Sequence, residues 1–146
     1  MKKIIIFDFN RTLYDPDQQC LVADARLVLQ ALRERGFSLC LISRAAPSRK
    51  ELITELGLDQ YFSRIVISDG KNKNDFEQCV PRDSVDRRSS FVVGDRVRKE
   101  IGIGNALGLQ TVWVMAGKFS DEKPQKEIEQ PSYTVGSLHE ILPIVR

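Results

Sequence analysis

The sequence predicts a three-layer α/β/α domain of the doubly wound type, with a mainly parallel sheet of five or six strands between two layers of helices. Short apolar runs rich in Ile, Val and Phe alternate with longer amphipathic segments along the chain. Strands that alternate with helices need crossover connections, and these connections make the strands parallel. A length of 146 residues suits one domain. We therefore expect residues 1–146 to form a single core domain.

The expected strands are runs of apolar residues that are nearly continuous. A continuous run, in contrast to an alternating one, is typical of a strand that is buried on both faces of a parallel sheet. The runs are Lys3–Phe9, Phe37–Ile42, Arg64–Ile67, Ser90–Val93 and Gln110–Val114.

The expected helices follow from apolar spacing and from residues that start or stop a helix. Apolar residues recur at helical spacing from Leu21 to Leu32, and Gly36 then stops that helix. The next helix begins at Pro47, and Gly57 follows its end. Further helices are expected at Phe76–Val80, Val97–Leu107 and Leu138–Val145, although two glycines in the second of these lower its helix propensity by roughly 1 kcal/mol each. The polar segment 120–131 is expected to be a surface loop or a frayed helix.

Composition and charge exclude several function classes. Lys and Arg number 22 against 20 Asp and Glu, so the net charge of +2 gives no general attraction to nucleic acid or to an anionic membrane. No apolar stretch has transmembrane length, and the run Ile4–Phe7 is too short for a signal peptide. The 3 cysteines form no Cys-x-x-Cys pair, which is consistent with free thiols in a reducing compartment. We therefore expect a cytoplasmic protein.

Polar residues follow the strands where each strand ends. The first four strands are followed by Asp8–Thr12, Ser43–Arg44, Ser68–Lys73 and Gly94–Arg96, respectively. In doubly wound sheets the ligand lies beyond the carboxyl ends of the strands, so these segments should converge on one rim. Carboxylates, a hydroxyl and ammonium groups on one rim suit a phosphoryl group accompanied by a divalent cation.

Four motifs in this order resemble those of the haloacid dehalogenase-like (HAD-like) hydrolase superfamily. They are the segment FDFNRTL at 7–13, Ser43 after the run LCLI, a lysine at 71 or 73, and the segment VGDRVRKEI at 93–101. The similarity extends to residues 106–114 and 132–138, which are similar to the closing strands and helix of the family. The resemblance implies a Rossmann-like core, Mg²⁺ as cofactor and a phosphorylated substrate.

The resemblance also implies the roles of individual residues. Asp8 would be the nucleophile that becomes an aspartyl-phosphate. Asp95 would hold Mg²⁺ together with Asp8 and the backbone carbonyl of Asn10, because this hard cation prefers oxygen ligands. Ser43 would hydrogen-bond the phosphoryl oxygens.

Other implied roles concern charge and substrate binding. A lysine would neutralise the aspartate and the phosphoryl group, and we prefer Lys73 to Lys71 for this role. Glu100 would act through water or by orienting that lysine. The candidate substrate-binding residues are Thr12, Ser43 and Arg44. Basic residues near the rim, among them Arg96 and Lys99, could hold an anionic substrate, although a run of charge is commonly a solvated face.

Asn10 departs from the family pattern, because phosphatases of the family commonly have an aspartate there as general acid and base. An amide cannot exchange a proton in this way, and such catalysis is typically worth about 10² to 10⁴ in rate. The backbone carbonyl survives the change, so binding of metal and phosphate should persist. The protein is then a slow or selective phosphatase, a phosphate-binding protein without activity, or a variant made to trap the phosphorylated state.

The spacing of the motifs leaves no room for a cap domain. Asn10 and Ser43 are separated by 32 residues, and Ser43 and Lys71 by 27, which the expected helices and strands already use. A site without a lid is open to water. The resemblance implies that such proteins act on phosphate displayed by a macromolecule or use a neighbouring subunit of a homo-oligomer as the lid.

Two hypotheses follow from the sequence. The first is a Mg²⁺-dependent phosphatase that acts through phospho-Asp8, with the chemistry slowed or narrowed by Asn10. The second is a regulatory or binding protein that keeps the phosphate and metal site without turnover. A receiver-type phosphoacceptor domain is less consistent with the sequence, because it would need paired acids after the first strand and its acceptor after the third.

Overall fold

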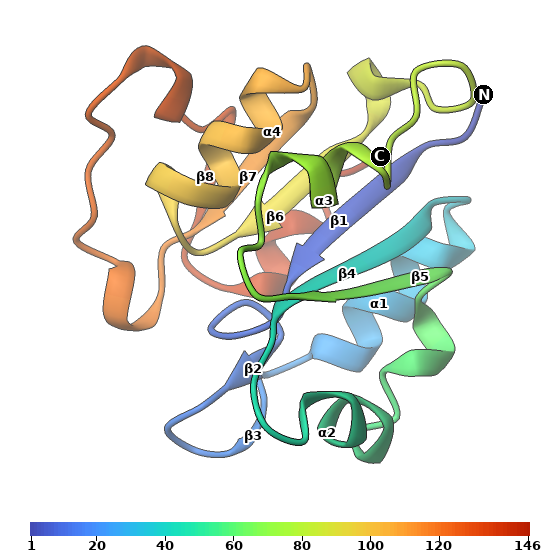
Figure 1. The fold of residues 1–146 in the computed structure, drawn as a ribbon, viewed down its shortest axis with the longest axis vertical. Coiled ribbons are helices and arrows are strands. Elements are labelled where there is room, and N and C mark those ends of the chain that lie inside the picture. The colour runs from blue at the N-terminus through green and yellow to red at the C-terminus, as the bar shows by residue number, and fades with distance from the viewer.

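The computed structural model describes residues 1–146 as a six-stranded parallel sheet with helices on both faces (Figure 1). The strand order is β5-β4-β1-β6-β7-β8. The five expected strands are present, and a sixth lies in the C-terminal segment that resembles the family. The strands are β1 (Ile4–Asp8), β4 (Ser38–Arg44), β5 (Arg64–Ser68), β6 (Phe91–Gly94), β7 (Gln110–Val114) and β8 (Tyr133–Val135). The predicted fold class is confirmed.

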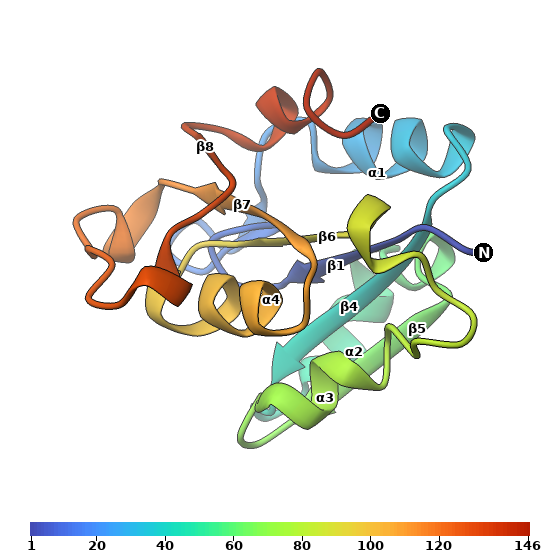
Figure 2. The ribbon, with the colours of Figure 1, turned by 90° about the horizontal axis from the view of Figure 1, so that it is seen from above.

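The helices form the two outer layers. Helix α1 and the C-terminal helical turn lie over one face of the sheet, whereas α3 and α4 lie over the other (Figure 2). No helix is both long enough and apolar enough to cross a membrane. The helices are α1 (Ala25–Glu34), α2 (Arg49–Glu55), α3 (Lys73–Glu77) and α4 (Gly102–Ala106), with a π-helical turn at Val97–Ile101 and a 3₁₀ turn at Leu138–Ile141.

Strand β1 joins the two halves of the hydrophobic core. Its side chains alternate, with Ile5 and Phe7 in a cluster of 22 buried residues on the α1 face. Ile4 and Ile6 belong to a second cluster of 11 buried residues on the face of α3 and α4. Because both faces of β1 are buried, its sequence is a continuous apolar run.

Several elements differ from the sequence-based expectation, each for a local reason. The first helix begins at Ala25 and not at Leu21, because Leu21 pairs with Tyr14 in a short hairpin. The C-terminal helix is a single 3₁₀ turn, because Pro143 lacks a backbone N–H and restricts the residue before it. Helix α3 begins at Lys73, earlier than expected, because Asn72 and Asp75 form a capping box. A hairpin of β2 (Tyr14–Asp15) and β3 (Cys20–Leu21) was not predicted, since strands of two residues leave no periodic pattern.

The order in which successive strands are added to the sheet reverses at β1. It passes from β1 to β4 and β5 on one side and then returns to β6 on the other side. The carboxyl ends of β1, β4 and β6 therefore meet at the switch point where ligands bind in such sheets. Only the small hairpin separates β1 from α1, and only residues 45–48 separate β4 from α2, so no cap domain is inserted at either place.

Gly104 permits the close approach of α4 to the sheet. A Cβ atom at this position would lie 2.7 Å from Thr111 Cγ2 and 3.0 Å from Val92 Cγ2. At Gly102, in the same helix, the nearest atom to a Cβ would be Glu129 Cγ at 3.6 Å, which is an ordinary contact.

Gly104→Ala is therefore expected to lower the free energy of unfolding by about 1–3 kcal/mol, as overpacking of a core does. Gly102→Ala should raise it by about 0.5–1 kcal/mol, because alanine favours the helical backbone. Urea unfolding of both variants checks this prediction. Equal effects of the two substitutions would show that the helix–sheet distance is not limited by Gly104.

Candidate active site

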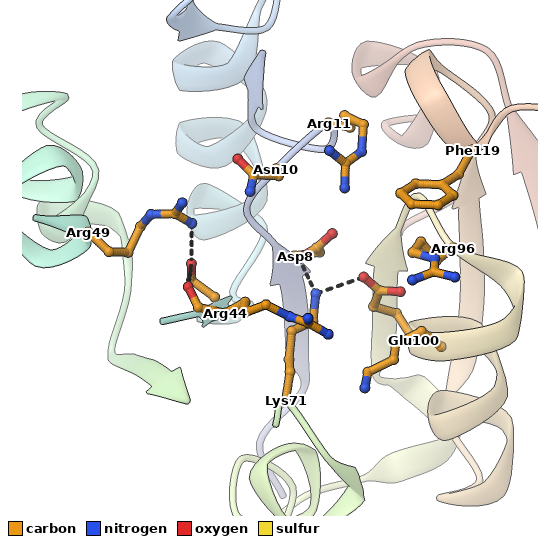
Figure 3. Close-up of a pocket in the computed structure, with 11 residues that line it drawn as sticks. Asp8, Asn10, Arg11, Arg44, Arg49, Lys71, Arg96, Glu100 and Phe119 are labelled. Atoms are coloured by element: carbon orange, nitrogen blue, oxygen red, sulfur yellow. Dashed lines mark hydrogen bonds and ion pairs between the residues drawn. The ribbon is translucent and has the colours of Figure 1, made fainter. Parts of the chain in front are cut away.

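The centre of the site is a buried lysine between two buried carboxylates (Figure 3). Lys71 Nζ donates to Asp8 Oδ1 and, at 2.8 Å, to Glu100 Oε1. Asp8 ends β1, Lys71 follows β5, and Glu100 lies in the π-helical turn after β6. One ammonium group thus joins three segments that are far apart in the sequence.

The preference for Lys73 over Lys71 was wrong. Lys73 is the first residue of α3, is exposed and does not line the cavity around Asp8. Lys71 is buried, and its φ of 45° places its backbone in the left-handed region. This conformation is uncommon for a residue with a side chain and fits a position held by its surroundings.

Burial dominates the electrostatics of the pair of acids. Burial raises the pKa of Asp8, although the charge of Lys71 acts in the opposite direction. Burial, followed by the charge of Asp8, raises the pKa of Glu100 to about 8. One ammonium group cannot neutralise two buried carboxylates, so a proton or another cation is needed for full charge balance.

Asp95 completes a group of acids that can hold a metal. Oxygens of Asp8, Asp95 and Glu100 lie within 4.8 Å of one another. Asp95 Oδ1 and Glu100 Oε2 are buried and have no hydrogen-bond partner. Unpartnered buried carboxylate oxygens are costly, and oxygens of this kind are the preferred ligands of Mg²⁺. The donor set therefore fits the divalent cation that the sequence predicts.

Neighbouring groups fix the position of Asp95. Its Oδ2 accepts a hydrogen bond from Arg11 Nε at 2.7 Å. Its backbone carbonyl accepts one from Trp113 Nε1 at 2.9 Å. Gly94, just before it, is in close contact with Glu100, because a Cβ at position 94 would lie 2.8 Å from Glu100 Cβ. The turn after β6 can bring both acids to the site only with glycine at position 94.

A cavity of about 190 Å³ opens beside Asp8 and has a strongly basic lining. On one side, Arg49 Nη1 donates to Ser43 Oγ at 2.7 Å, and the Arg49 guanidinium lies 4.6 Å from the centre of the Phe9 ring. Polar lining residues include Asn10 and Ser43. The basic lining residues are Arg11, Arg44, Arg49, Lys71, Arg96 and Lys99.

Phe119 supports the opposite side of the cavity. The guanidinium groups of Arg11 and Arg96 lie 4.8 Å and 4.1 Å from the centre of its ring. Arg96 also pairs with Glu122 at 3.0 Å. Cation–π contacts and this ion pair hold two arginines at the edge of the site.

Most of the predicted site residues come together in this structure. Asp8, Asn10, Ser43, Arg44 and Glu100 line the cavity, and Asp95 lies directly beside Asp8. Thr12 is the exception, because its side chain is buried and is not part of the lining. In the turn after β1, the backbone N–H of Thr12 donates to the Phe9 carbonyl. The substrate-binding role expected for Thr12 is therefore not supported by its position.

Three lining residues were not identified from the sequence. Arg11 follows Asn10 directly, and Arg49 lies six residues after Ser43 at the start of α2. Their closeness in sequence to predicted site residues was a weak indication that they line the site. Phe119 ends a 3₁₀ turn, Gly117–Phe119, in a segment that carries no motif, so it has no such signal. Its place at the site depends on the packing of the segment after β7.

Comparison with known proteins now assigns the family. The sequence model of the HAD-hydrolase-like family matches residues 69–141, which include the segments that carry Lys71, Asp95 and Glu100. The chain belongs to the HAD-like hydrolases. The resemblance identified from the motifs is thereby confirmed.

Relatives and solved structures agree with this assignment. The chain is 32% identical over 124 residues to the glyceraldehyde 3-phosphate phosphatase of Methanopyrus kandleri, an alignment that covers 81% of this chain and 53% of that protein. The chain spans about half the length of the curated relatives it matches.

Two solved structures share the fold. A HAD phosphatase from Thermococcus onnurineus superposes with a TM-score of 0.77 and 14% identity, covering 99% of this chain and 97% of that one. The HAD-hydrolase YfnB of Bacillus subtilis, solved bound to magnesium, has a TM-score of 0.69 and 21% identity and covers 86% of this chain and 56% of that one. At these identities the likeness concerns the fold.

The ion pairs of Lys71 with Asp8 and Glu100 should contribute to the stability of the folded protein. In buffer without divalent cations, Lys71→Met should lower the free energy of unfolding by roughly 3 kcal/mol, because it leaves two buried carboxylates without a cation. The matched variant Lys73→Met should change it by no more than about 0.5 kcal/mol, since Lys73 is exposed. Denaturant unfolding measures both. Adding Glu100→Gln to Lys71→Met should recover part of the loss, and similar effects at 71 and 73 would contradict the placement of Lys71.

The raised pKa of Glu100 predicts a pH dependence of stability. Between the unfolded value of about 4.3 and the folded value of about 8, the native protein retains a proton that the unfolded chain has released. The free energy of unfolding should therefore fall as the pH rises through this window. Glu100→Gln cannot titrate, so its decline between pH 5 and pH 8 in metal-free buffer should be smaller than that of the unmodified protein. An equal decline would show that Glu100 is ionised in the native state throughout.

Proposed function

We propose that this protein is a Mg²⁺-dependent phosphoric monoester hydrolase in which Asp8 is the nucleophile. The proposal rests on the position of Asp8 at the end of β1, where it pairs with Lys71 and lies close to Asp95. Asp8 and Ser43 also line the same basic cavity. The membership in the HAD-like hydrolases and the phosphatase relatives support the same reaction.

The chain's own residues account for both half-reactions. In the first, a carboxylate oxygen of Asp8 attacks phosphorus, a bond from phosphorus to Asp8 forms, the bond from phosphorus to the leaving oxygen breaks, and that oxygen takes a proton from solvent. In the second, a water oxygen bonds to phosphorus, the aspartyl-phosphate bond breaks, and the water proton passes to solvent. Asp8 is then free as a carboxylate, and the products are an alcohol and inorganic phosphate.

Three side chains would hold the phosphoryl oxygens during these steps. Lys71 lies against Asp8, so its ammonium group is placed to oppose negative charge that develops next to the nucleophile. Ser43 and Arg49 are joined by a hydrogen bond and line the same cavity, so both can donate to phosphoryl oxygens. Donors that are fixed before the substrate arrives require little rearrangement during the reaction.

The metal site would be formed by Asp8, Asp95 and the backbone carbonyl of Asn10, with Glu100 nearby. When bound by these residues, Mg²⁺ would supply positive charge that neutralises the phosphoryl oxygens. The two unpartnered oxygens, Asp95 Oδ1 and Glu100 Oε2, are the structural support for this assignment.

Asn10 limits the proton transfers in both half-reactions. Its amide lines the cavity, but it can neither protonate a leaving alkoxide nor take a proton from the attacking water. We therefore propose a slow enzyme, or one whose substrate has a leaving group of low pKa. The same residue favours the second candidate function, a protein that binds phosphate and metal without turnover.

The substrate is proposed to be a small phosphorylated compound. The cavity of about 190 Å³ is modest, and the curated relative from Methanopyrus kandleri is named for a three-carbon phosphate. Action on a macromolecule and the use of a neighbouring subunit as a lid stay predictions.

Hydrolysis of an activated aryl phosphate, with and without Mg²⁺, tests the proposed function. Turnover should need the metal and should vanish in Asp8→Asn, which keeps the shape of the side chain. In Asn10→Asp, hydrolysis of a simple alkyl phosphate should rise by about 10² to 10⁴, whereas the activated ester should gain less because its leaving group needs little protonation.

Each outcome of this experiment separates the two candidate functions. No turnover in the unmodified protein or in Asn10→Asp, combined with phosphate binding, would overturn the enzymatic proposal and leave a binding protein. Turnover that survives Asp8→Asn would rule out Asp8 as the nucleophile.

A further inference from the structure

The basic residues of the cavity fall into two groups. Three of them have carboxylate partners, because Lys71 pairs with Asp8 and Glu100, Arg11 with Asp95, and Arg96 with Glu122. The other three form no ion pair. They are Arg44, Arg49 and Lys99. The cavity therefore has more positive charge than its own acids balance.

Arg49 is accounted for by the phosphoryl group. Its guanidinium is held between the Phe9 ring and Ser43 Oγ, and Ser43 is the hydroxyl that would bind a phosphoryl oxygen. An anion on Ser43 would thus also contact Arg49. Together with Lys71, this residue completes the basic side of one phosphate site.

Arg44 and Lys99 form a second basic pair that one phosphate does not require. Arg44 ends β4 and Lys99 lies in the turn after β6, so they come from opposite sides of β1. Arg44 lines the cavity, and its side chain extends toward Lys71 in the close-up (Figure 3). Lys99 Nζ donates to the Gly70 carbonyl at 3.0 Å.

The positively charged side chains at this edge of the cavity repel one another. Burial and then the charges of Arg44 and Lys71 lower the pKa of Lys99. A fully solvated lysine would extend away from such neighbours, as the exposed Lys50 and Lys73 can. Lys99 is instead partly buried and fixed to a backbone carbonyl, so the arrangement favours an anion between Lys99 and Arg44.

We propose that the substrate carries a second anionic group, a carboxylate or a second phosphate, which Arg44 and Lys99 bind while Ser43 and Arg49 hold the phosphoryl group that is removed. This inference rests on the proposed function. Both sets of residues line one cavity of about 190 Å³, so the two anionic groups belong to one small molecule with a short spacer.

Two pairs of compounds test the inference. 3-Phospho-D-glycerate and sn-glycerol 1-phosphate have the same configuration at C2 and differ only in a carboxylate against a hydroxymethyl group. The bisphosphate and the monophosphate of 1,3-propanediol differ in a second phosphate. We expect kcat/KM for the member with the second anion to be about 10- to 100-fold higher in at least one pair, which is the usual effect of hydrogen bonds between charged groups. The pair that shows the preference identifies the anion as carboxylate or phosphate.

Variants assign the preference to the two residues. Arg44→Gln and Lys99→Gln should each reduce the ratio within that pair toward one, chiefly through KM. Lys50→Gln removes an exposed positive charge that does not line the cavity and should leave the ratio unchanged. A preference that is equally lost in Lys50→Gln would reflect general charge rather than a second anion site, and would overturn the inference.

A binding measurement separates this inference from the proposed function. Calorimetry of the same compounds with Mg²⁺-loaded Asp8→Asn reports recognition without turnover. Tighter binding of the compound with two anionic groups would support the second anion site even if the unmodified protein hydrolyses nothing, in which case only the enzymatic proposal fails. Hydrolysis of the aryl phosphate, combined with equal kcat/KM and equal binding within both pairs, would overturn the second anion site and leave the proposed function intact.

Discussion

The buried ammonium group of Lys71 between Asp8 and Glu100 is the interaction on which the geometry of the site depends. It joins the ends of β1, β5 and β6 at the switch point of the sheet. One ammonium group balances only one of the two buried acids, so the other either keeps a proton or is balanced by a further cation. The same ion pairs hold the ends of three strands together at this rim, and in the proposed function they oppose the charge of the phosphoryl group.

Several local departures from ideal geometry maintain this arrangement. Lys71 has a left-handed backbone, and Glu100 lies in a π-helical turn. Gly94 allows that turn to approach β6, since a Cβ there would overlap Glu100. Such departures are unfavourable by themselves and persist where the surrounding core over-determines them. Here the surroundings are the two hydrophobic clusters on the faces of the sheet.

The site has many groups that can bind an anion but lacks a titratable group at Asn10. The cavity is rich in donors and positive charge, whereas the residue two positions after Asp8 is an amide, Asn10. Recognition of an anion depends on fixed donors and charges, and these do not need a proton to move. Proton transfer requires a titratable group within hydrogen-bond reach, which Asn10 is not. Under the proposed function, such a site would bind a phosphate ester more readily than it would hydrolyse an unactivated one.

The fold class could be predicted from the amino-acid sequence, because apolar periodicity and the residues at strand ends are local properties of the chain. The family could be predicted from the resemblance of four motifs in order. The sequence placed Asp8, Ser43, Asp95 and Glu100 on one rim, and this structure brings them there. Only the tertiary structure decided between Lys71 and Lys73, because the choice depends on where α3 begins and on a left-handed backbone.

The basic lining and Phe119 were also decided at the tertiary level. Arg11, Arg49 and Phe119 come from segments whose contacts are made across the sheet, and no local spacing records a contact between distant segments. The excess of unpaired positive charge is likewise a property of how side chains meet in three dimensions. The net charge of only +2 does not reveal this local excess of positive charge.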